Sequence, residues 1–426
     1  MGPTKFTALF HEFIDVFVWS YKDLRGFDPG VIQHSIPLEE GVVRVRQRQR
    51  QVNPKLDVLI RKELDKMLDA NIIFPVRYSK WVANLVPIRK KNGDIRLCVD
   101  FLDLNRVTVK DNFPLPFMDA ILQQVARSEM MSLLDGFSGY NQVFINPRDR
   151  YKTTFTTRWG TYAYHRMPFG LINASATFQR AMHIAFDDLI GVIIQIFLDD
   201  LTVHSRKRAD HFEHLRQVFL RCRQYGISLN PTKSIFGTTQ GKLLGHIMSE
   251  EGVRIDPTRV AAIQNLPPPN SKKATHSFMG KINFVRRFVP DFAQIIKPIN
   301  SLLRRDTNFD WDNNRQSMFT SIKDAIASAP VLAKPDFNRD FLLYTNMTEE
   351  AISAILTQTD PEGHERPIAF MSQILTDVEF KFPYVEKHAL ALVVALRKFR
   401  HYIHGRHTIV KLPIPVVKQL LSQTYL

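Results

Sequence analysis

The 426-residue chain has few cysteines and no long apolar segment. Its two cysteines, Cys98 and Cys222, are too few for a disulfide framework and indicate a reducing compartment. The longest apolar run, Leu189 to Leu198, is interrupted by Gly191 and Gln195 and is far too short to span a bilayer. The first residues lack a secretory apolar region and a myristoylation signal. These features argue against a disulfide-rich secreted scaffold and against a membrane partner.

Acidic residues are scarce relative to basic ones. The chain contains 57 Lys and Arg against 42 Asp and Glu, which gives a formal net charge of +15. Such an excess favours a polyanionic partner such as a nucleic acid, with binding that weakens as salt rises. Ribosomal or membrane-surface association would produce the same excess.

Two adjacent acids, Asp199 and Asp200, nevertheless lie between two apolar runs within residues 194–204. The runs are rich in β-branched and aromatic residues, which predicts two buried strands with the acidic pair at the tight turn between them. A surface hairpin explains this stretch equally well. Upstream, Asp135 ends another apolar strand. Three carboxylates that converge from neighbouring strands can hold two magnesium ions about 3.5–4 Å apart, the arrangement that polymerases use for phosphoryl transfer.

The motif Phe197-Leu198-Asp199-Asp200 resembles the Tyr/Phe-x-Asp-Asp box of reverse transcriptases. The surrounding sequence, from about residue 9 to residue 421, is similar to the polymerase of gypsy-type LTR retrotransposons, particularly their plant members. The resemblance implies an α+β right-hand polymerase of fingers, palm and thumb, followed by a ribonuclease-H-like α/β domain. It also implies that Asp135, Asp199 and Asp200 are catalytic and bind two Mg²⁺ ions, with Mn²⁺ as an alternative.

A basic hairpin is predicted within residues 84–101, because Asn92-Gly93 between two apolar runs is a strong turn signal. By itself, such a hairpin is often an edge strand protected by its charge. Here it resembles the fingers hairpin of reverse transcriptases, in which cations neutralise a triphosphate. The resemblance assigns dNTP binding to Arg96 and to Lys90 or Lys91, because the turn length leaves the choice of lysine open.

Tyr140 occupies the place of the family's aromatic gate, where a ring would clash with a ribose 2′-hydroxyl and so select dNTPs. Taken alone, it is equally typical of a core tyrosine. Residues 167–179 resemble the family's template-proximal signature, which implies that Phe169 and Gly170 contact the dNTP. Gly170 allows close backbone approach, and a helix is predicted to begin near Ser175. Many members of the family have Pro where this chain has Ser175.

Further residues are assigned by the same resemblance. Lys233 matches the catalytic lysine proposed to protonate pyrophosphate, and Leu244, Gly245 and His246 match the hairpin that grips the primer end. Three histidines without acidic or cysteine partners at zinc-like spacing are predicted to lie at the surface or to face phosphate: His204, His211 and His214.

The C-terminal part departs from the family pattern. Asn346 stands where the first metal-binding Asp of a ribonuclease H belongs, His388 replaces the helix Glu, and the third acid would fall near Pro413. No acid follows Glu386, whereas seven Lys or Arg do. Neutral or cationic side chains cannot supply the charge that two magnesium ions require. We therefore predict a degenerate domain without nuclease activity, while binding of an RNA–DNA hybrid stays open.

Length and 44% hydrophobic content leave room for about two to four domains. Residues 1–55 are predicted to form an N-terminal arm, in which alternating arginines at 44, 46, 48 and 50 are suited to phosphates or simply solvated. Fingers and palm are expected at 56–250, thumb and connection at 251–330, and the degenerate, truncated ribonuclease-H-like domain at 331–426. A stiff Pro267-Pro268-Pro269 segment precedes the thumb helices.

The resemblance implies an RNA-directed DNA polymerase of a retrotransposon that adds dNMP to a primer. Its implied partners are an RNA template, a DNA primer, an RNA–DNA hybrid and dNTP, with a homodimer left open. The implied location is the cytoplasm, in a virus-like particle, with the nucleus as the alternative. Without protease or integrase motifs, the chain is interpreted as a polyprotein piece or a decayed copy. A competing hypothesis is an inactive relic that only binds nucleic acid, which the eroded C-terminus favours.

Overall fold

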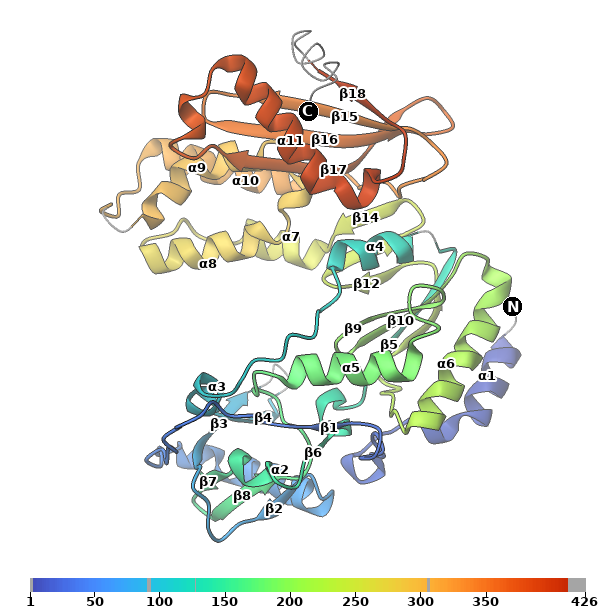
Figure 1. Ribbon diagram of the computed structural model, residues 1–426, viewed down its shortest axis with the longest axis vertical. Helices are drawn as coiled ribbons and strands as arrows, with labels where there is room; N and C mark the ends of the chain where they lie inside the picture. The colour runs from blue at the N-terminus through green and yellow to red at the C-terminus, as the bar shows by residue number, and fades with distance from the viewer. Residues whose placement is uncertain (1–2, 90–92, 127, 305–306, 413–426) are drawn as a thin grey trace. The chain divides into compact units, whose positions relative to one another are not determined.

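The computed structural model describes residues 3–89, 93–126, 128–304 and 307–412 (Figure 1). The chain divides into two compact units, Met1–Thr239 and Gln240–Leu426, and each is described by itself. The division falls before the boundary expected at residue 250. Strands between residues 241 and 255 pair with one another in a separate sheet, which explains the earlier division.

The first unit mixes helices and strands along the sequence, as the predicted α+β class requires. Its helices are α1 (Pro3–Glu12), α2 (Asp57–Asp69), α3 (Leu102–Arg106), α4 (Met118–Ala126), α5 (Ala174–Phe186) and α6 (His211–Tyr225). Its strands are β1 (Gln33–His34), β2 (Ile73–Pro75), β3 (Ala83–Arg89), β4 (Ile95–Val99), β5 (Met130–Asp135), β6 (Phe144–Ile145), β7 (Phe155–Thr157), β8 (Gly160–Tyr164), β9 (Ile194–Phe197), β10 (Asp200–Ser205) and β11 (Ile235–Thr238).

One four-stranded sheet, which we call the β5 sheet, has the order β11-β5-β10-β9 with antiparallel neighbours throughout. Its strands are rich in Ile, Leu and Val, which suit a pleated and buried surface. Helix α6 packs against β10 and β5, and helix α5 packs against β9. As a result, every residue of β10 after Asp200 is buried.

A second sheet, which we call the β3 sheet, has the order β2-β8-β7-β3-β4. Strands β3 and β4 form the predicted basic hairpin, in which Ile88 pairs with Arg96 and Arg89 with Ile95. Gly93 has a φ of 88°, a conformation that glycine adopts without steric cost. The sequence signal for this hairpin is therefore confirmed. Two short strands, β1 and β6, pair separately in parallel.

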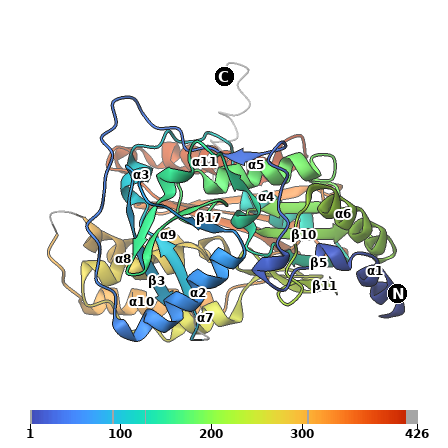
Figure 2. The same cartoon turned by 90° about the horizontal axis from the view of Figure 1, so that it is seen from below.

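The segment predicted as an N-terminal arm contributes to the core of the first unit. Helix α1 lies beside α6 in both views (Figures 1 and 2), and the rings of Phe10 and Phe219 are 6.4 Å apart. Leu9 and Phe13 are fully buried. The arginines at 44, 46 and 48 are exposed, as expected for a phosphate-facing or solvated row. Arg50 is also exposed and in addition forms an ion pair with Asp100 at 2.6 Å.

The second unit contains two separate sheets and five α-helices within its described residues. Its strands are β12 (Gly241–Leu243), β13 (His246–Ser249), β14 (Gly252–Ile255), β15 (Phe341–Met347), β16 (Ala351–Thr359), β17 (Glu365–Ile374) and β18 (Thr408–Lys411). Its helices are α7 (Pro257–Gln264), α8 (Lys272–Asn283), α9 (Phe292–Asn300), α10 (Asn313–Ala327) and α11 (Tyr384–Ile403).

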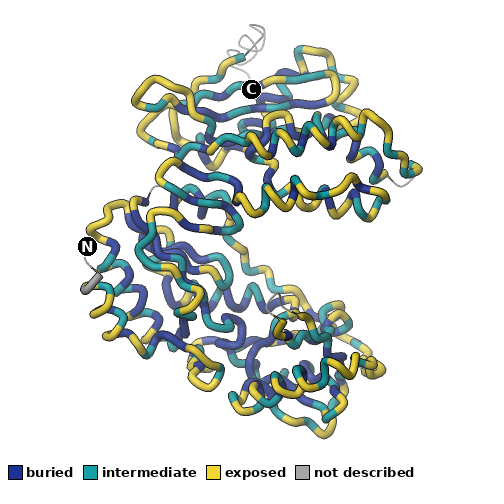
Figure 3. Tube along the Cα trace, turned by 180° about the vertical axis from the view of Figure 1, so that it is seen from behind, coloured by how far each residue is buried: buried dark blue, intermediate teal, exposed yellow. Residues whose placement is uncertain are grey.

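The C-terminal sheet has the order β17-β16-β15-β18, and helix α11 packs against β15 and β16. Phe341, Leu356 and Phe399 are among the residues that form its buried core, drawn dark blue in Figure 3. In the helical part, Phe278 and Phe288 are buried, so aromatics at this spacing are core residues rather than base-stacking platforms. Among the described residues, no helix has the length and apolar character needed to cross a membrane.

The prediction that three histidines face solvent or phosphate is wrong for two of them. His204 and His211 are buried, and His211 shares hydrogen bonds with Ser132 (2.7 Å) and Ser205 (2.8 Å). Burial lowers the pKa of both imidazoles to about 4, so both are neutral. Most of their hydrogen-bond partners come from other segments, such as Ser128 for His204 and Ser132 for His211, which sequence spacing alone does not reveal.

Candidate active site

The two central acids lie at a tight hairpin between β9 and β10. Phe197 pairs with Asp200, so the turn consists of Leu198 and Asp199 rather than of the two acids. Leu198 has a φ of 54°, which costs a residue with a Cβ atom about 1–2 kcal/mol. Asp200 opens β10 and is directly opposite Asp135, the last residue of β5. The fold therefore brings together the three carboxylates predicted from the sequence.

Asp199 is the most strongly perturbed of the three. Its Oδ1 atom is buried and has no hydrogen-bond donor among the described residues. Burial, together with the negative charges of Asp135 and Asp200, raises the pKa of Asp199 to about 6, although Lys233 and Arg96 partly oppose this. A buried carboxylate oxygen without a donor is costly unless a cation compensates it. This environment fits a divalent metal site with oxygen ligands.

Gly139 makes the room in which Asp199 lies. A Cβ atom on Gly139 would stand 2.2 Å from Asp199 Oδ1 and 3.2 Å from the ring of Phe178. Any larger residue would therefore displace the carboxylate. We did not identify Gly139 from the sequence, where its only signal is a small residue directly before Tyr140.

Asp135 and Asp200 keep contact with solvent. Partial burial of the Asp200 carboxyl, together with the negative charge of the nearby Asp135, raises the pKa of Asp200. Lys233 donates a hydrogen bond from Nζ to Asp135 Oδ1 at 3.3 Å, and its side chain remains 64% exposed. Because it is exposed, the ammonium group can leave this carboxylate when another cation or a substrate phosphate approaches.

In the described structure, Asp135, Asp199 and Asp200 do not bring three ligand atoms within 4.8 Å of one another. Within the described ranges, only Asp360, Glu362 and His364 bring three ligand atoms within 4.8 Å of one another. Glu362 and His364 are exposed and Asp360 is half-buried; the group lies between β16 and β17, where Asp360 Oδ1 accepts backbone N–H bonds that close the turn.

Helix α5 holds the carboxylate hairpin from behind. Gln179 is fully buried; its Oε1 atom accepts the Leu198 N–H at 3.0 Å, and its Nε2 atom donates to the Ile196 carbonyl at 3.3 Å. These bonds satisfy the backbone at the turn residue with positive φ. Gln179 lies in the signature recognised from the sequence, but its role became visible only in the fold.

The predicted dNTP residues line the neighbouring part of the first unit. The rings of Tyr140 and Phe169 are 4.8 Å apart, and the guanidinium of Arg96 lies 5.4 Å from the Phe169 ring. Arg96 itself is exposed on β4. Gly170 has a φ of 97° and accepts a hydrogen bond from Asn105 at 2.8 Å. Lys90 and Lys91 lie outside the described residues.

Tyr140 is 8% exposed and belongs to the core of the first unit. Its pKa is raised by burial and, to a smaller extent, by the charge of Asp199. The ring is therefore close to the carboxylates while most of its surface is packed. The burial of Tyr140 agrees with the core interpretation, and its role as a sugar gate stays a prediction.

The residues predicted to grip a primer belong to the second unit. Leu244 and Gly245 form the turn between β12 and β13 with φ values of 48° and 76°, a combination typical of a two-residue hairpin. His246 is buried, and its ring stacks on Phe284 and Phe288 at 4.9 and 5.5 Å. The His246 side chain is thus a core group, so only Leu244 and Gly245 remain accessible for a primer contact.

The predicted degenerate nuclease positions lie on β15 and α11. Asn346 is exposed and pairs with Ser353. His388 is buried, neither of its ring nitrogens has a hydrogen-bond partner among the described residues, and burial lowers its pKa. A neutral imidazole provides no negative charge for a metal. Pro413 lies outside the described residues.

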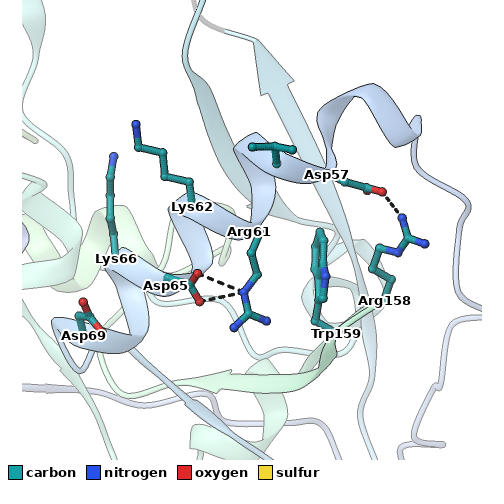
Figure 4. Close-up of a pocket in the computed structure, with 9 residues that line it drawn as sticks. Asp57, Arg61, Lys62, Asp65, Lys66, Asp69, Arg158 and Trp159 are labelled. Carbon is teal, nitrogen blue, oxygen red and sulfur yellow. Dashed lines mark hydrogen bonds and ion pairs between the residues drawn. The ribbon is translucent and has the colours of Figure 1, made fainter.

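A surface cavity of about 630 Å³ lies apart from these groups, over α2 and the β7–β8 turn (Figure 4). Its lining includes Trp159 and several charged residues of both signs. Arg61 pairs with Asp65, and Arg158 pairs with Asp57. No residue predicted for the site contributes to it. Because its charges are largely paired, we assign the chemistry to the carboxylates instead.

Two family models match the chain. Residues 88–248 match the model described as reverse transcriptase (RNA-dependent DNA polymerase). Residues 311–410 match the model described as RNase H-like domain found in reverse transcriptase. These segments contain the carboxylate site and the C-terminal sheet, respectively.

Curated relatives include retrovirus-related Pol polyproteins of Drosophila melanogaster. The one from transposon 297 is 32% identical over 359 residues, which are 83% of this chain and 33% of that protein. The one from transposon opus is 33% identical over 367 residues, 82% of this chain and 36% of that protein. The chain thus spans about a third of the length of the curated relatives that it matches.

Solved structures of the foamy viral protease-reverse transcriptase share the fold. One, in complex with ds DNA, has a TM-score of 0.88 at 22% identity and covers 100% of this chain and 74% of that chain. Another, in complex with an RNA/DNA hybrid, has a TM-score of 0.83 at 22% identity, with coverages of 100% and 57%. These likenesses confirm the α+β fold expected from the sequence.

Proposed function

Because this chain carries a reverse transcriptase domain and an RNase H-like domain and is related to gypsy-type Pol polyproteins, we propose that it is an RNA-directed DNA polymerase that adds dNMP to a primer by a two-metal mechanism. We further propose that its RNase H-like domain has lost nuclease activity. The substrates would be a primer on an RNA or DNA template and a dNTP.

One observation carries the proposal. Asp199 is half-buried and has a buried Oδ1 atom without a hydrogen-bond partner among the described residues, beside Asp135 and Asp200 at the same end of the β5 sheet. Burial, together with the negative charges of Asp135 and Asp200, raises the pKa of Asp199 to about 6 when no cation is bound. A purely structural role would not offset the free-energy cost of an unpaired, buried carboxylate oxygen, whereas a bound cation would.

Asp135, Asp199 and Asp200 would hold the metal ions. When bound, Mg²⁺ would supply activation of the primer 3′-hydroxyl and neutralisation of the triphosphate. Arg96, exposed on the basic hairpin, would add positive charge at the phosphates as the bond breaks. The exposed ammonium of Lys233 is available to protonate the leaving pyrophosphate.

Tyr140 would select the sugar. Its small exposed edge would occupy the space that a ribose 2′-hydroxyl requires, while the rest of the ring is packed against Phe169 and Phe178. Leu244 and Gly245 would contact the primer through their turn. The buried His246 would support this turn from below, since its Nδ1 lies 3.0 Å from the Leu244 carbonyl.

Loss of the nuclease is supported by the side chains at the former acid positions. Asn346 is neutral, and the burial of His388 favours its neutral form. Two-metal hydrolysis needs carboxylates to hold both ions in register with the scissile phosphate. Without them, this domain would at most bind a hybrid duplex.

Primer extension on a homopolymer RNA template with Mg²⁺ and the complementary dNTP tests the polymerase. Asp135→Asn and Asp199→Asn should each lower kcat by at least about 1,000-fold, while duplex binding changes by less than about threefold, because the metals serve chemistry more than affinity. A matched control is Asp188→Asn, which removes an exposed acid paired with Arg221. Near wild-type kcat in either site variant would mean that the metal site is wrong.

Labelled RNA–DNA hybrid tests the nuclease. Incubation with the protein and Mg²⁺ or Mn²⁺ should leave the RNA strand uncut while a gel shift shows binding. Internal cleavage that persists in Asp199→Asn would overturn the proposed loss, because that variant excludes the polymerase site as its source. Duplex binding without any primer extension by the wild-type chain would instead favour the binding-only relic.

A further inference from the structure

A hydrogen bond links the candidate sugar gate to helix α5. The hydroxyl groups of Tyr140 and Ser175 are 2.8 Å apart, and either can donate. Ser175 is the second residue of α5, whereas Tyr140 lies 35 residues earlier in the 3-10 turn Gly139–Gln142. The bond therefore joins two segments that local sequence does not bring together.

The Tyr140 ring is held from several directions. Phe169 and Phe178 pack against it, with ring centroids 4.8 and 5.5 Å away. The backbone of its turn is held by Gln142, whose buried side chain donates to the carbonyls of Phe137 and Ser228 at 2.9 Å each. Packing limits the tilt of the ring, and among the described residues the hydroxyl of Tyr140 forms a hydrogen bond only with Ser175.

We propose that Ser175 is a positioning residue that fixes the Tyr140 ring and thereby sharpens discrimination between dNTP and rNTP. The inference rests on the proposed polymerase function. A ring can exclude a ribose 2′-hydroxyl by steric clash only if the ring stays in a fixed position. With 8% of Tyr140 exposed, a small displacement of the ring changes most of the surface that a sugar meets.

Ser175 is well placed for this role because its helix also holds the carboxylates. Gln179, one helical turn later, binds the Leu198 N–H of the carboxylate hairpin. Residues four apart lie on the same face of a helix. The same face of α5 thus holds the position of the Tyr140 ring and the position of the carboxylate hairpin. A single rigid helix would therefore keep the sugar-binding surface at a fixed distance from the carboxylates.

The test compares kcat/KM for single-nucleotide addition of a dNTP and of the matching rNTP. Ser175→Ala should lower the dNTP to rNTP ratio about 2- to 10-fold, the range expected for one hydrogen bond, chiefly through a lower KM for the rNTP. The kcat with dNTP should stay within about twofold of wild type. Ser175→Thr keeps the hydroxyl and should restore the ratio. Ser79→Ala, which removes a serine hydroxyl bonded to the Trp81 carbonyl, serves as the control.

Tyr140→Phe removes the other half of the same bond. It should lower the ratio as Ser175→Ala does, and the double variant should be no worse than either single variant, because both remove one interaction. The positioning role would be overturned if the two single-variant effects on the dNTP to rNTP ratio multiply in the double variant. It would also be overturned if Ser175→Ala leaves the ratio unchanged or lowers kcat equally with both nucleotides.

Tyr140→Ala distinguishes a failure of the positioning role of Ser175 from a failure of the proposed sugar gate. If Tyr140→Ala relaxes sugar selection but Ser175→Ala does not, Ser175 has no positioning role and the gate stands. If Tyr140→Ala leaves the ratio unchanged, the gate assignment fails and the role of Ser175 fails with it. If the wild-type chain adds no nucleotide, the proposed polymerase function is refuted, and this inference is refuted as a consequence.

Discussion

Replacing Gln179 with Met tests whether helix α5 holds the carboxylate hairpin in its active geometry. The two side chains have similar volume, so the packing of this fully buried position is largely kept. The change removes the acceptor for the Leu198 N–H and the donor to the Ile196 carbonyl. An unsatisfied N–H costs about 1–3 kcal/mol and the second lost bond about 1 kcal/mol, so the free energy of unfolding should fall by about 2–4 kcal/mol.

The effect on catalysis should be larger than the effect on stability implies. Leu198 has a φ of 54°, and without its hydrogen bond the turn can relax toward an ordinary conformation that moves Asp199. A displacement of about 1 Å at a catalytic group can cost about 100-fold in rate. Gln179→Met should therefore lower kcat by about 10- to 100-fold at a temperature where the protein is still folded.

The assay pairs urea unfolding, followed by tryptophan fluorescence and circular dichroism, with single-nucleotide primer extension. The control is Gln123→Met in α4, because the buried Nε2 of Gln123 has no hydrogen-bond partner in the described structure. That variant should keep both stability and kcat. The reasoning is refuted if Gln179→Met is as active as wild type, or if both Gln variants lose the same free energy.

Two further perturbations address the Asp199 environment. Gly139→Ala should lower kcat by about 100-fold, because its Cβ would stand 2.2 Å from Asp199 Oδ1; Gly136→Ala, with 3.7 Å to its nearest neighbour, should stay within about threefold of wild type. Without divalent ions, Asp199 has a folded-state pKa of about 6 against 3.8, so its contribution to stability falls as pH rises from about 4 to 6. Asp199→Asn should therefore raise the free energy of unfolding in EDTA by roughly 1–3 kcal/mol above pH 6 and by nothing below pH 4. Equal differences at pH 4 and pH 8 would contradict this origin.

Local sequence determined the elements that carry the chemistry. An apolar run before Asp135, and apolar runs rich in β-branched and aromatic residues around Asp199, predict strands that end in acids, and Asn92-Gly93 predicts the basic hairpin. Both signals depend on residue type and backbone preference within about ten residues. Tertiary contacts therefore did not change the secondary structure of these segments. The missing acids at Asn346 and His388 are equally local, because a residue type is read directly from the chain.

Tertiary structure decided which side chains are accessible and which residues support the site. His204 and His246 have polar side chains that sequence placed at a surface or on a primer, yet each is buried among groups supplied by other segments. Gly139 faces Asp199 across 60 residues, and Ser175 meets Tyr140 across 35. Such contacts depend on how strands and helices pack, and the periodicity of a single element contains no information about its partner. The sequence alone therefore identified the carboxylates, whereas only packing revealed what holds them and the gate in place.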